Sequence, residues 1–359
     1  MNRNIFLDLL QALDDGEKSA VLTVVKDQQE SNQQLEKVLV RAGENMSAVL
    51  ERYSCDTLLP TIETALNTGY VKHDEQNLRY FVEPYYPEPQ LIVLGGGHIA
   101  KPLVELGKKV GFATTVVDDR LFFANRERFP DADTVICDSF ERCFEKLNLN
   151  KSAYVVIVTR GHRHDLVCLK ETLKHTTAYT GMIGSSRRII SVMEMLMDEG
   201  YDPERLAKVC APIGIDIGAV TPDEIAISII AEVIEHRRKN NLYQMKDQRV
   251  KTHWPEYDHD VLRELSKNDQ QPKAIVTILS SKGSVPRKAG AKMIVWPDGR
   301  IIGSIGGGCS EADVITTAYE VIRTGKHVIQ TVDMTGEVAE NEGMVCGGIM
   351  EVMIEPWQI

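Results

Sequence analysis

The sequence is poor in aromatic residues, has no excess of basic residues and contains no long hydrophobic run. Aromatic residues make up only 6% of the 359 residues, so the base-stacking surfaces of proteins that bind single-stranded nucleic acid are not expected. The formal net charge of −11 argues against binding to nucleic acid or to an anionic membrane surface. No apolar stretch approaches the roughly 20 residues of a membrane span, and no signal-peptide pattern follows Met1. We therefore expect a soluble cytoplasmic protein.

Cysteine usage excludes further classes. The chain has 7 cysteines, an odd and scattered set, and it has no Cys-x-x-Cys pair. A disulfide framework, a zinc ribbon and a thioredoxin-type redox pair therefore have no support in the sequence. The cysteines that suggest a function are the two that lie within glycine-rich segments.

The middle of the chain alternates short β-branched runs with segments long enough for helices. The runs are apolar throughout rather than alternating, which is typical of strands buried on both faces of a parallel sheet. We predict a doubly wound, Rossmann-like α/β domain over residues 88–236. A helix is expected to begin with Thr221 as its N-cap, and a polar linker is expected over residues 237–258. The predicted strands are 91–94, 114–117, 134–137, 154–158 and 178–183.

A glycine-rich turn follows the first of these strands. The segment from Gly95 to Ala100 has the G-x-G-x-x-A spacing, in which the glycines permit a tight turn and the close approach of a pyrophosphate. An acid at the end of the next strand binds ribose hydroxyls in such folds, and an arginine follows it here. The candidate cofactor-binding residues are Gly95, Gly96, Gly97, His98, Asp118 and Arg120. The alternative is a turn that serves packing only, and the nucleotide, NAD(P) or another, stays open.

Two more loops follow predicted strands and should line the same crevice, because the carboxyl ends of parallel strands face the ligand. A serine in the second loop can cap the next helix, whose N-terminus would form an anion site with the arginine beside it. The alternative for that arginine is a solvated pair. The histidines of the first loop lack a third ligand at suitable spacing, so no metal site is predicted. The candidate contacts are Arg160 and His162 in the first loop, and Ser185 and Arg187 in the second.

The most informative segment is Gly303-Ser304-Ile305-Gly306-Gly307-Gly308-Cys309-Ser310-Glu311. Because Gly306, Gly307 and Gly308 have no side chains, the thiol that follows them is unobstructed and backbone N–H groups can approach a ligand closely. Ser310 is expected to be the N-cap of a helix with Asp313 as its capping acid, which places Cys309 at the helix N-terminus, where the dipole favours thiolate.

A second cysteine near the end of the chain has similar surroundings. Cys346 lies within Gly343-Met344-Val345-Cys346-Gly347-Gly348, at a predicted strand start. Both cysteines are candidate functional thiols. The alternative for each is that the glycines only make a tight turn.

A basic loop, Gly283–Gly290, lies shortly before the first cysteine. Pro286 stiffens this loop, and Arg287 offers two parallel hydrogen bonds to an oxyanion. Basic groups beside a candidate thiolate, on an acidic chain, indicate an anionic ligand that is handled by sulfur.

The two ends of the chain contain an internal repeat. Residues 20–25 are similar to 274–279, residues 66–69 to 322–325, and residues 81–84 to 353–356. The first copy has no Gly-Gly-Gly-Cys loop and no second glycine-wrapped cysteine, and Cys55 near that position lacks glycines. We interpret this as a duplicated scaffold that has lost its chemistry in one copy. Chance similarity of two small α+β modules is the alternative.

These motifs resemble the XdhC/CoxI family. The cysteine-bearing segments and the basic loop are similar to one domain of that family, and the Gly95 turn with Asp118-Asp119-Arg120, Gly184–Arg188 and Pro212-Ile213-Gly214 is similar to its other domain. The resemblance implies a Rossmann-like sheet flanked by two smaller α+β modules, of which the N-terminal one is degenerate. The predicted domains are residues 1–87 (degenerate module), 88–236 (nucleotide-binding), 237–258 (linker) and 259–359 (intact module).

The resemblance also implies a function. Family members are accessory factors of molybdenum hydroxylases such as xanthine dehydrogenase; they bind and protect molybdenum cofactor and assist its sulfuration and insertion. The implied ligand is molybdenum cofactor, held transiently and in some bacteria in dinucleotide form. The implied partners are a molybdenum hydroxylase client and a cysteine desulfurase. A homodimer is expected from the incomplete flanking copy, with modules of different chains sharing a cleft. The family's functional cysteine falls on Cys309, with Cys346 as a second site.

Three other functions stay open. The Gly95 turn is compatible with an NAD(P)-dependent oxidoreductase, Cys309 with Cys346 is compatible with a sulfur-carrier or redox pair, and a purely structural partner protein is the third alternative. The chain itself is not the dehydrogenase, because two [2Fe–2S] clusters would need about eight cysteine ligands and only 7 cysteines exist. We expect a cofactor-maturation factor rather than a stand-alone enzyme. In one respect the chain departs from the family, since its intact cysteine module follows the Rossmann domain instead of preceding it.

Overall fold

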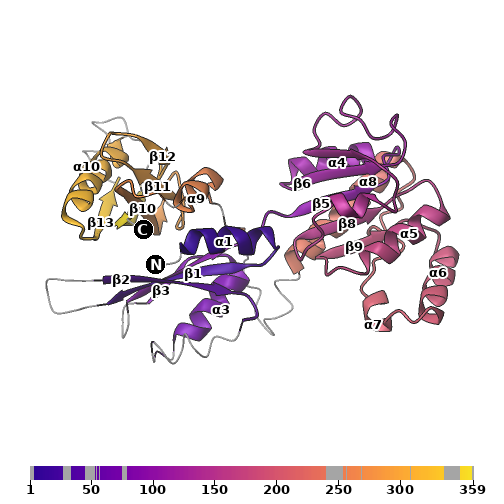
Figure 1. Cartoon of the computed structure of the whole chain (residues 1–359), viewed down its shortest axis with the longest axis horizontal. Helices are drawn as coiled ribbons and strands as arrows, with labels where there is room; N and C mark the ends of the chain where they lie inside the picture. The colour runs from indigo at the N-terminus through magenta and orange to yellow at the C-terminus, as the bar shows by residue number, and fades with distance from the viewer. Residues whose placement is uncertain are drawn as a thin grey trace. The chain divides into compact units, whose positions relative to one another are not determined.

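The chain forms two compact units (Figure 1). The computed structural model describes residues 4–26, 34–44, 53, 55, 57–74, 79–239, 254–255, 257–267, 269–307, 309–334 and 348–357. Unit 1 combines Met1–Tyr86 with Val250–Ile359, and unit 2 is Pro87–Arg249. The two predicted α+β modules at the ends of the chain therefore belong to one unit.

Unit 2 is the predicted doubly wound domain. Its five strands are β5 (Gln90–Leu94), β6 (Ala113–Asp118), β7 (Thr134–Cys137), β8 (Ala153–Ile157) and β9 (Tyr179–Met182), all parallel in the order β7-β6-β5-β8-β9. The connections contain α4 (Ala100–Lys109), the 3-10 helix η1 (Cys143–Lys146), α5 (His162–Thr172), α6 (Ser186–Asp198), α7 (Pro203–Leu206) and α8 (Pro222–Lys239). The predicted strand positions and the parallel sheet are confirmed.

Helices cover both faces of this sheet because successive residues of each strand point to opposite sides. Leu91 and Val93 of β5 share one core with α4 and α8. Ile92 and Leu94 of the same strand share a second core with α5 and α6. Burial on both faces explains why these strands are apolar at every position.

Helix α8 begins as the sequence predicts. Thr221 Oγ1 accepts a hydrogen bond from Glu224 N at 3.3 Å, and Glu224 Oε2 accepts one from Thr221 N at 2.9 Å, which is a complete capping box. The helix continues through Lys239, so residues 237–239 of the predicted linker are helical. Most of the remaining linker lies outside the described residues.

Unit 1 contains two antiparallel sheets. The N-terminal module has α1 (Ile5–Asp14), α3 (Leu58–Thr68) and the strands β1 (Ser19–Lys26), β2 (Gln34–Arg41), β3 (Lys72–Asp74) and β4 (Tyr80–Tyr85), in the order β2-β1-β4-β3. The C-terminal module has α9 (His259–Leu265), α10 (Cys309–Thr324) and the strands β10 (Lys273–Gly283), β11 (Lys292–Val295), β12 (Ile301–Gly303), β13 (Val328–Asp333) and β14 (Gly348–Trp357), in the order β12-β11-β10-β14-β13.

Strand register confirms the internal repeat. In the N-terminal module Val21 pairs with Glu83, and in the C-terminal module the equivalent Ile275 pairs with Glu355. Helices α3 and α10 both end in threonine, followed by Gly69 at φ 75° and a second glycine, Gly325, at φ 69°. The two modules are therefore copies of one scaffold.

The two sheets contact each other through the faces that turn away from α3 and α10. One face of each sheet packs on its own helix, with Ala20, Leu22 and Val24 in one module and Ala274, Val276 and Ile278 in the other. The opposite faces share two common cores. The smaller core consists of Val25 and Phe81 with their repeat equivalents Leu279 and Met353, and the larger one includes residues of α1 and α9. The degenerate copy thus covers a sheet face of the intact copy.

Candidate functional site

The motif segments of the C-terminal module meet at one end of its sheet. Gly283, where the basic loop begins, pairs with Gly348 of β14, and a side chain on Gly348 would lie 2.5 Å from a Val285 methyl carbon. Gly306 has φ 147°, and a Cβ on it would lie 3.1 Å from Pro286 Cγ. The basic loop therefore lies between the glycine-rich segment before Cys309 and the strand that follows Cys346. Gly308 and Cys346 themselves lie outside the described residues.

We call residues 303–309 the cysteine loop. Cys309 is the first residue of α10, which confirms its predicted place at a helix N-terminus. The predicted cap was wrong in detail, since the helix begins one residue before Ser310. Glu311, in the first turn of α10, accepts hydrogen bonds from the backbone of the loop that precedes the helix.

One carboxylate oxygen of Glu311 accepts hydrogen bonds from four donors of the cysteine loop. Its Oε1 accepts from the backbone nitrogens of Ile305 at 2.9 Å, Gly306 at 3.1 Å and Gly307 at 2.8 Å, and from Ser304 Oγ at 2.7 Å. Successive N–H groups that point at one anion form a nest. Partial burial alone would raise the pKa of Glu311, but the bonds from Ser304 and from these amides outweigh it and hold that pKa below its usual value.

Arg287 is the cation next to this nest. It follows Pro286, which packs on Gly306, and it is half-buried. Its Nε is buried and has no hydrogen-bond partner among the described residues. A buried donor without a partner is uncommon in folded proteins, so this guanidinium is suited to an anionic group beyond those of the described residues.

In unit 2, the three glycines of the Gly95–Gly97 turn have different roles. A Cβ on Gly95, at φ 114°, would lie 2.4 Å from Val158 O, and one on Gly96 would lie 2.0 Å from Phe123 O. No atom lies within 4 Å of the corresponding position on Gly97. Packing therefore requires the first two glycines, and only Gly97 leaves open space for a ligand. Arg128 closes the turn, since its Nε donates to Gly96 O at 3.0 Å.

Asp118, the predicted ribose ligand, is buried and bound by the protein. Its carboxylate accepts from Gly96 N at 2.9 Å and from Arg120 Nε at 2.8 Å and Nη2 at 3.0 Å. Burial would raise the pKa of Asp118, but the bonds from Arg120 and Gly96 outweigh it and lower that pKa. Arg120 also lies over the Phe123 ring, 3.8 Å from its centroid. The two predicted cofactor contacts thus form an ion pair with each other, in which Asp118 is buried and the Arg120 side chain is 34% exposed.

The remaining predicted contacts lie at the carboxyl ends of β8 and β9. Arg160 donates to both oxygens of Asp119, at 2.7 and 2.9 Å, and its Nη2 lies 3.3 Å from His164 Nε2. His98, His162, Ser185 and Arg187 are exposed. These side chains belong to three loops at the same edge of the sheet, as predicted.

The sequence reasoning missed an ion pair at this edge. Arg188 donates to the buried Asp165, which also accepts from Thr159 Oγ1 at 2.5 Å. Burial raises the pKa of Asp165, although the bonds from Thr159 and Arg188 oppose the rise. Arg188 Nε and His164 Nδ1 are buried without a hydrogen-bond partner among the described residues. The available signals in the sequence were the arginine pair at the start of α6 and the acid in the first turn of α5.

The described residues contain neither a metal-ligand cluster nor a membrane-spanning helix. No group of three or more His, Cys, Asp or Glu side chains is placed to hold a metal ion. No helix in the described part of the chain is both long and apolar enough to cross a membrane.

Comparison with known proteins relates the two units to two family domains. Residues 91–233 match the family described as the XdhC Rossmann domain, and residues 267–333 match the XdhC and CoxI family. A probable xanthine dehydrogenase subunit of Bacillus subtilis (strain 168) is 28% identical over 184 residues, which are 51% of this chain and 54% of that protein. "Uncharacterized protein YqeB" of Escherichia coli (strain K12) is 31% identical over 162 residues, 45% of this chain and 29% of that protein.

A solved structure is also similar. The crystal structure of a xanthine dehydrogenase from Bacillus halodurans superimposes with a TM-score of 0.46 at 24% sequence identity, covering 67% of this chain and 65% of that one. The matched segment spans about half of the Bacillus subtilis relative and less than a third of the Escherichia coli relative.

Proposed function

Because the chain belongs to the XdhC/CoxI family, we propose that it is an accessory factor of a molybdenum hydroxylase such as xanthine dehydrogenase. In this proposal it binds molybdenum cofactor and assists its sulfuration and insertion into the client enzyme. The observation that carries the proposal is the meeting of three segments in unit 1: the cysteine loop, the basic loop and the strand after Cys346.

The side chains of this site fit an anionic, sulfur-binding cargo. Arg287 has a buried donor without a partner among the described residues, so it would bind a phosphate or another oxyanion of the cargo. The cysteine loop places Cys309 at the N-terminus of α10, where the helix dipole stabilises a thiolate. That thiolate would face the metal or the transferred sulfur, and Cys346 would supply a second thiol. Glu311 would hold the loop rather than touch the cargo, since one of its oxygens is engaged four times.

Unit 2, taken by itself, would bind a nucleotide. Support comes from the open space at Gly97 and from donors of Arg188 and His164 that find no partner in the described part of the chain, at the same sheet edge. We further propose that the client hydroxylase and a cysteine desulfurase are partners in the cytoplasm.

The test is to purify the protein from cells that make molybdenum cofactor and to measure the fluorescent pterin released on denaturation. We expect release from the wild-type chain and from Cys137→Ala, a variant of an exposed thiol on β7. Cys309→Ala and Arg287→Ala should release little pterin at unchanged thermal stability. Equal release from all four proteins would contradict the proposal.

A second candidate function is an NAD(P)-dependent oxidoreductase, favoured by the open approach to Gly97 in a parallel sheet. Calorimetric titration with NAD and NADP tests it. Binding of either, weakened by Gly97→Val, would support this function, and no heat of binding with either nucleotide would exclude it.

A further inference from the structure

Two buried lysine–glutamate pairs connect the modules of unit 1, and the internal repeat relates them. Lys292 Nζ lies 2.6 Å from Glu83 Oε1 of the other module and donates to Thr277 Oγ1 at 2.8 Å. Lys37 Nζ lies 2.9 Å from Glu355 Oε1 and donates to Thr23 Oγ1 at 3.0 Å. Each lysine thus contacts the threonine of its own module and the glutamate of the other. The Lys292 and Glu83 side chains are 5% and 3% exposed, and those of Lys37 and Glu355 are 9% and 4% exposed.

The two pairs differ in the segment that precedes each lysine. In the N-terminal module the pairing of β1 with β2 continues past Thr23↔Lys37 to Lys26↔Gln34. In the C-terminal module the pairing of β10 with β11 stops at Thr277↔Lys292. The residues that would extend this hairpin form the basic loop instead. Backbone hydrogen bonds join Ile278 of β10 to Gly290 and Ala291 at 2.8 and 3.0 Å, so Lys292 lies two residues beyond the end of the basic loop, next to its attachment to the sheet.

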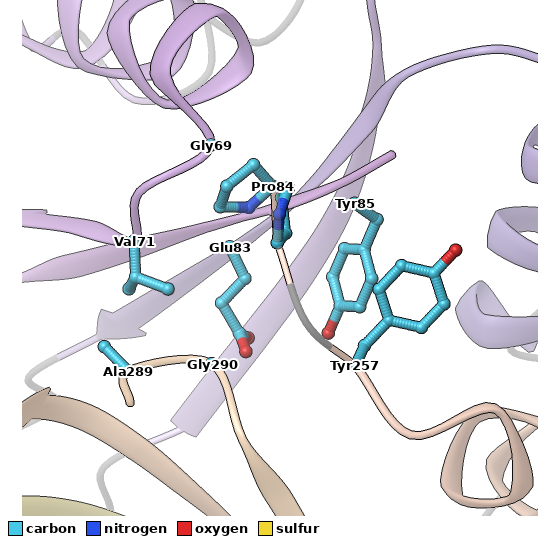
Figure 2. A pocket seen from close by; sticks show the side chains of 9 residues that line it. Gly69, Val71, Glu83, Pro84, Tyr85, Tyr257, Ala289 and Gly290 are labelled. Atoms are coloured by element: carbon cyan, nitrogen blue, oxygen red, sulfur yellow. The ribbon is translucent and has the colours of Figure 1, made fainter. Parts of the chain in front are cut away.

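The N-terminal module also touches the end of the basic loop directly. Gly69, Val71 and Glu83 line a small cavity together with Ala289 and Gly290 (Figure 2). Figure 2 shows the Glu83 carboxylate pointing toward Gly290. Gly290 has φ 96°, and a Cβ on it would lie 3.3 Å from Val71 Cγ2. The cavity volume of about 20 Å³ is close to that of one water probe, so the loop end lies tightly against this surface.

We propose that Glu83 is a positioning residue: the degenerate N-terminal module braces the basic loop of the intact module through Glu83, Lys292 and Val71. The brace acts on the site in two steps. Glu83 and Val71 fix the end of the basic loop at Gly290 and Lys292, and Pro286 of the same loop packs on Gly306 of the cysteine loop. This inference rests on the proposed function in one respect, which is that the basic loop and the cysteine loop form the functional site. It gives the copy without a cysteine loop a role in the chemistry of the other copy.

The repeat supplies a matched control. Glu83→Gln and Glu355→Gln remove the same charge from repeat-related, similarly buried ion pairs. Among the described residues, only the Glu83 carboxylate is also hydrogen-bonded to its lysine. Both variants should lose comparable thermal stability. Only Glu83→Gln should loosen the cysteine loop, because only Lys292 adjoins the basic loop.

The measurement is the alkylation rate of Cys309 in the full-length protein, read by mass spectrometry against the exposed Cys137 of the same sample. We expect Glu83→Gln to raise this rate by about fivefold or more, as for coupled residues in contact, and Glu355→Gln to change it by less than about twofold. Equal changes in both variants, or no change in Glu83→Gln, would overturn the proposal.

Two further variants keep the test decisive if Glu83→Gln does not fold. The double variant Glu83→Gln with Lys292→Met removes both charges, so no uncompensated charge remains buried. Val71→Ala removes the side chain that lies against Gly290 and leaves the ion pair intact. A raised Cys309 rate in both supports the brace, and a wild-type rate in both overturns it. Pterin release is measured separately. If Glu83→Gln changes the alkylation rate of Cys309 but the wild-type protein releases no pterin, the positioning role of Glu83 is supported and the proposed function is contradicted.

Discussion

Glu311 Oε1 lies 2.8 Å from the backbone nitrogen of Gly307, two residues before the cysteine that begins α10. The same oxygen accepts from two other amides and from Ser304, so one carboxylate fixes the shape of the whole cysteine loop. Glu311→Gln keeps the size of the side chain and replaces the charge-assisted bonds with neutral ones. We expect a loss of about 1–2 kcal/mol of unfolding free energy, reduced by partial solvent exposure, measured by urea denaturation. Asp313→Asn, a helix change outside the nest, serves as control, and an equal loss in both variants would argue against the nest.

The same carboxylate predicts a pH dependence. The pKa of Glu311 is lower in the folded protein than its usual value of 4.5, so the stabilisation is present above that value. It is lost as the pH falls through the lower folded pKa. The difference in melting temperature between wild type and Glu311→Gln should therefore be constant near neutral pH and shrink in the acidic range below 4.5. A difference that is unchanged down to acid unfolding would contradict this assignment.

Neighbouring glycines of unit 2 should respond differently to alanine. Gly96→Ala places a methyl group 2.0 Å from Phe123 O, and overpacking of this kind costs about 1–3 kcal/mol in unfolding free energy. Gly97→Ala meets no atom within 4 Å and should leave the melting temperature close to that of the wild type. Thermal unfolding of the two variants tests the pair. Similar destabilisation by both would contradict the packing role given to Gly96.

Native thiols should react in the order of their exposure. Cys137 is exposed, whereas Cys143 is buried and its burial, followed by the charge of Asp138, raises the pKa of its thiol to about 12. At neutral pH only about one Cys143 thiol in 10⁵ is then ionised. Peptide mapping after brief alkylation should find Cys137 modified and Cys143 unmodified. Rapid alkylation of Cys143 in folded protein would show that the core around η1 opens readily.

The sequence argument for a dimer changes once the fold is known. That prediction rested on an incomplete copy needing a partner, and unit 1 provides the pairing within one chain through Val25, Phe81, Leu279 and Met353. A homodimer stays a prediction, and the pairing of copies no longer requires it. If the need to pair the two copies was the only reason to expect a homodimer, light scattering at micromolar concentration should give the mass of a single chain. A dimer that Phe81→Asp leaves intact would show that chains associate through another surface.

The fold was largely predictable because its signals are local. The buried strands, the Gly95 turn and the capping box at Thr221 are all patterns within a few residues, and the structure contains each of them. The bonds from the cysteine loop to Glu311 were missed because the path of the backbone through the glycines, not helical spacing, brings Glu311 to the loop. The pairing of Asp118 with Arg120 was missed because sequence spacing does not show which way two side chains turn. Lys292 and Glu83 are 209 residues apart, and only the repeat could have indicated their contact.

The most direct test of the account is to measure the activity of the client molybdenum hydroxylase matured in cells that lack this protein and are complemented with its variants. Wild type and Cys137→Ala should restore activity equally, whereas Cys309→Ala should leave a client with low activity and little inserted, sulfurated molybdenum cofactor. Full client activity with Cys309→Ala, at the same protein level, would contradict the role assigned to the cysteine loop.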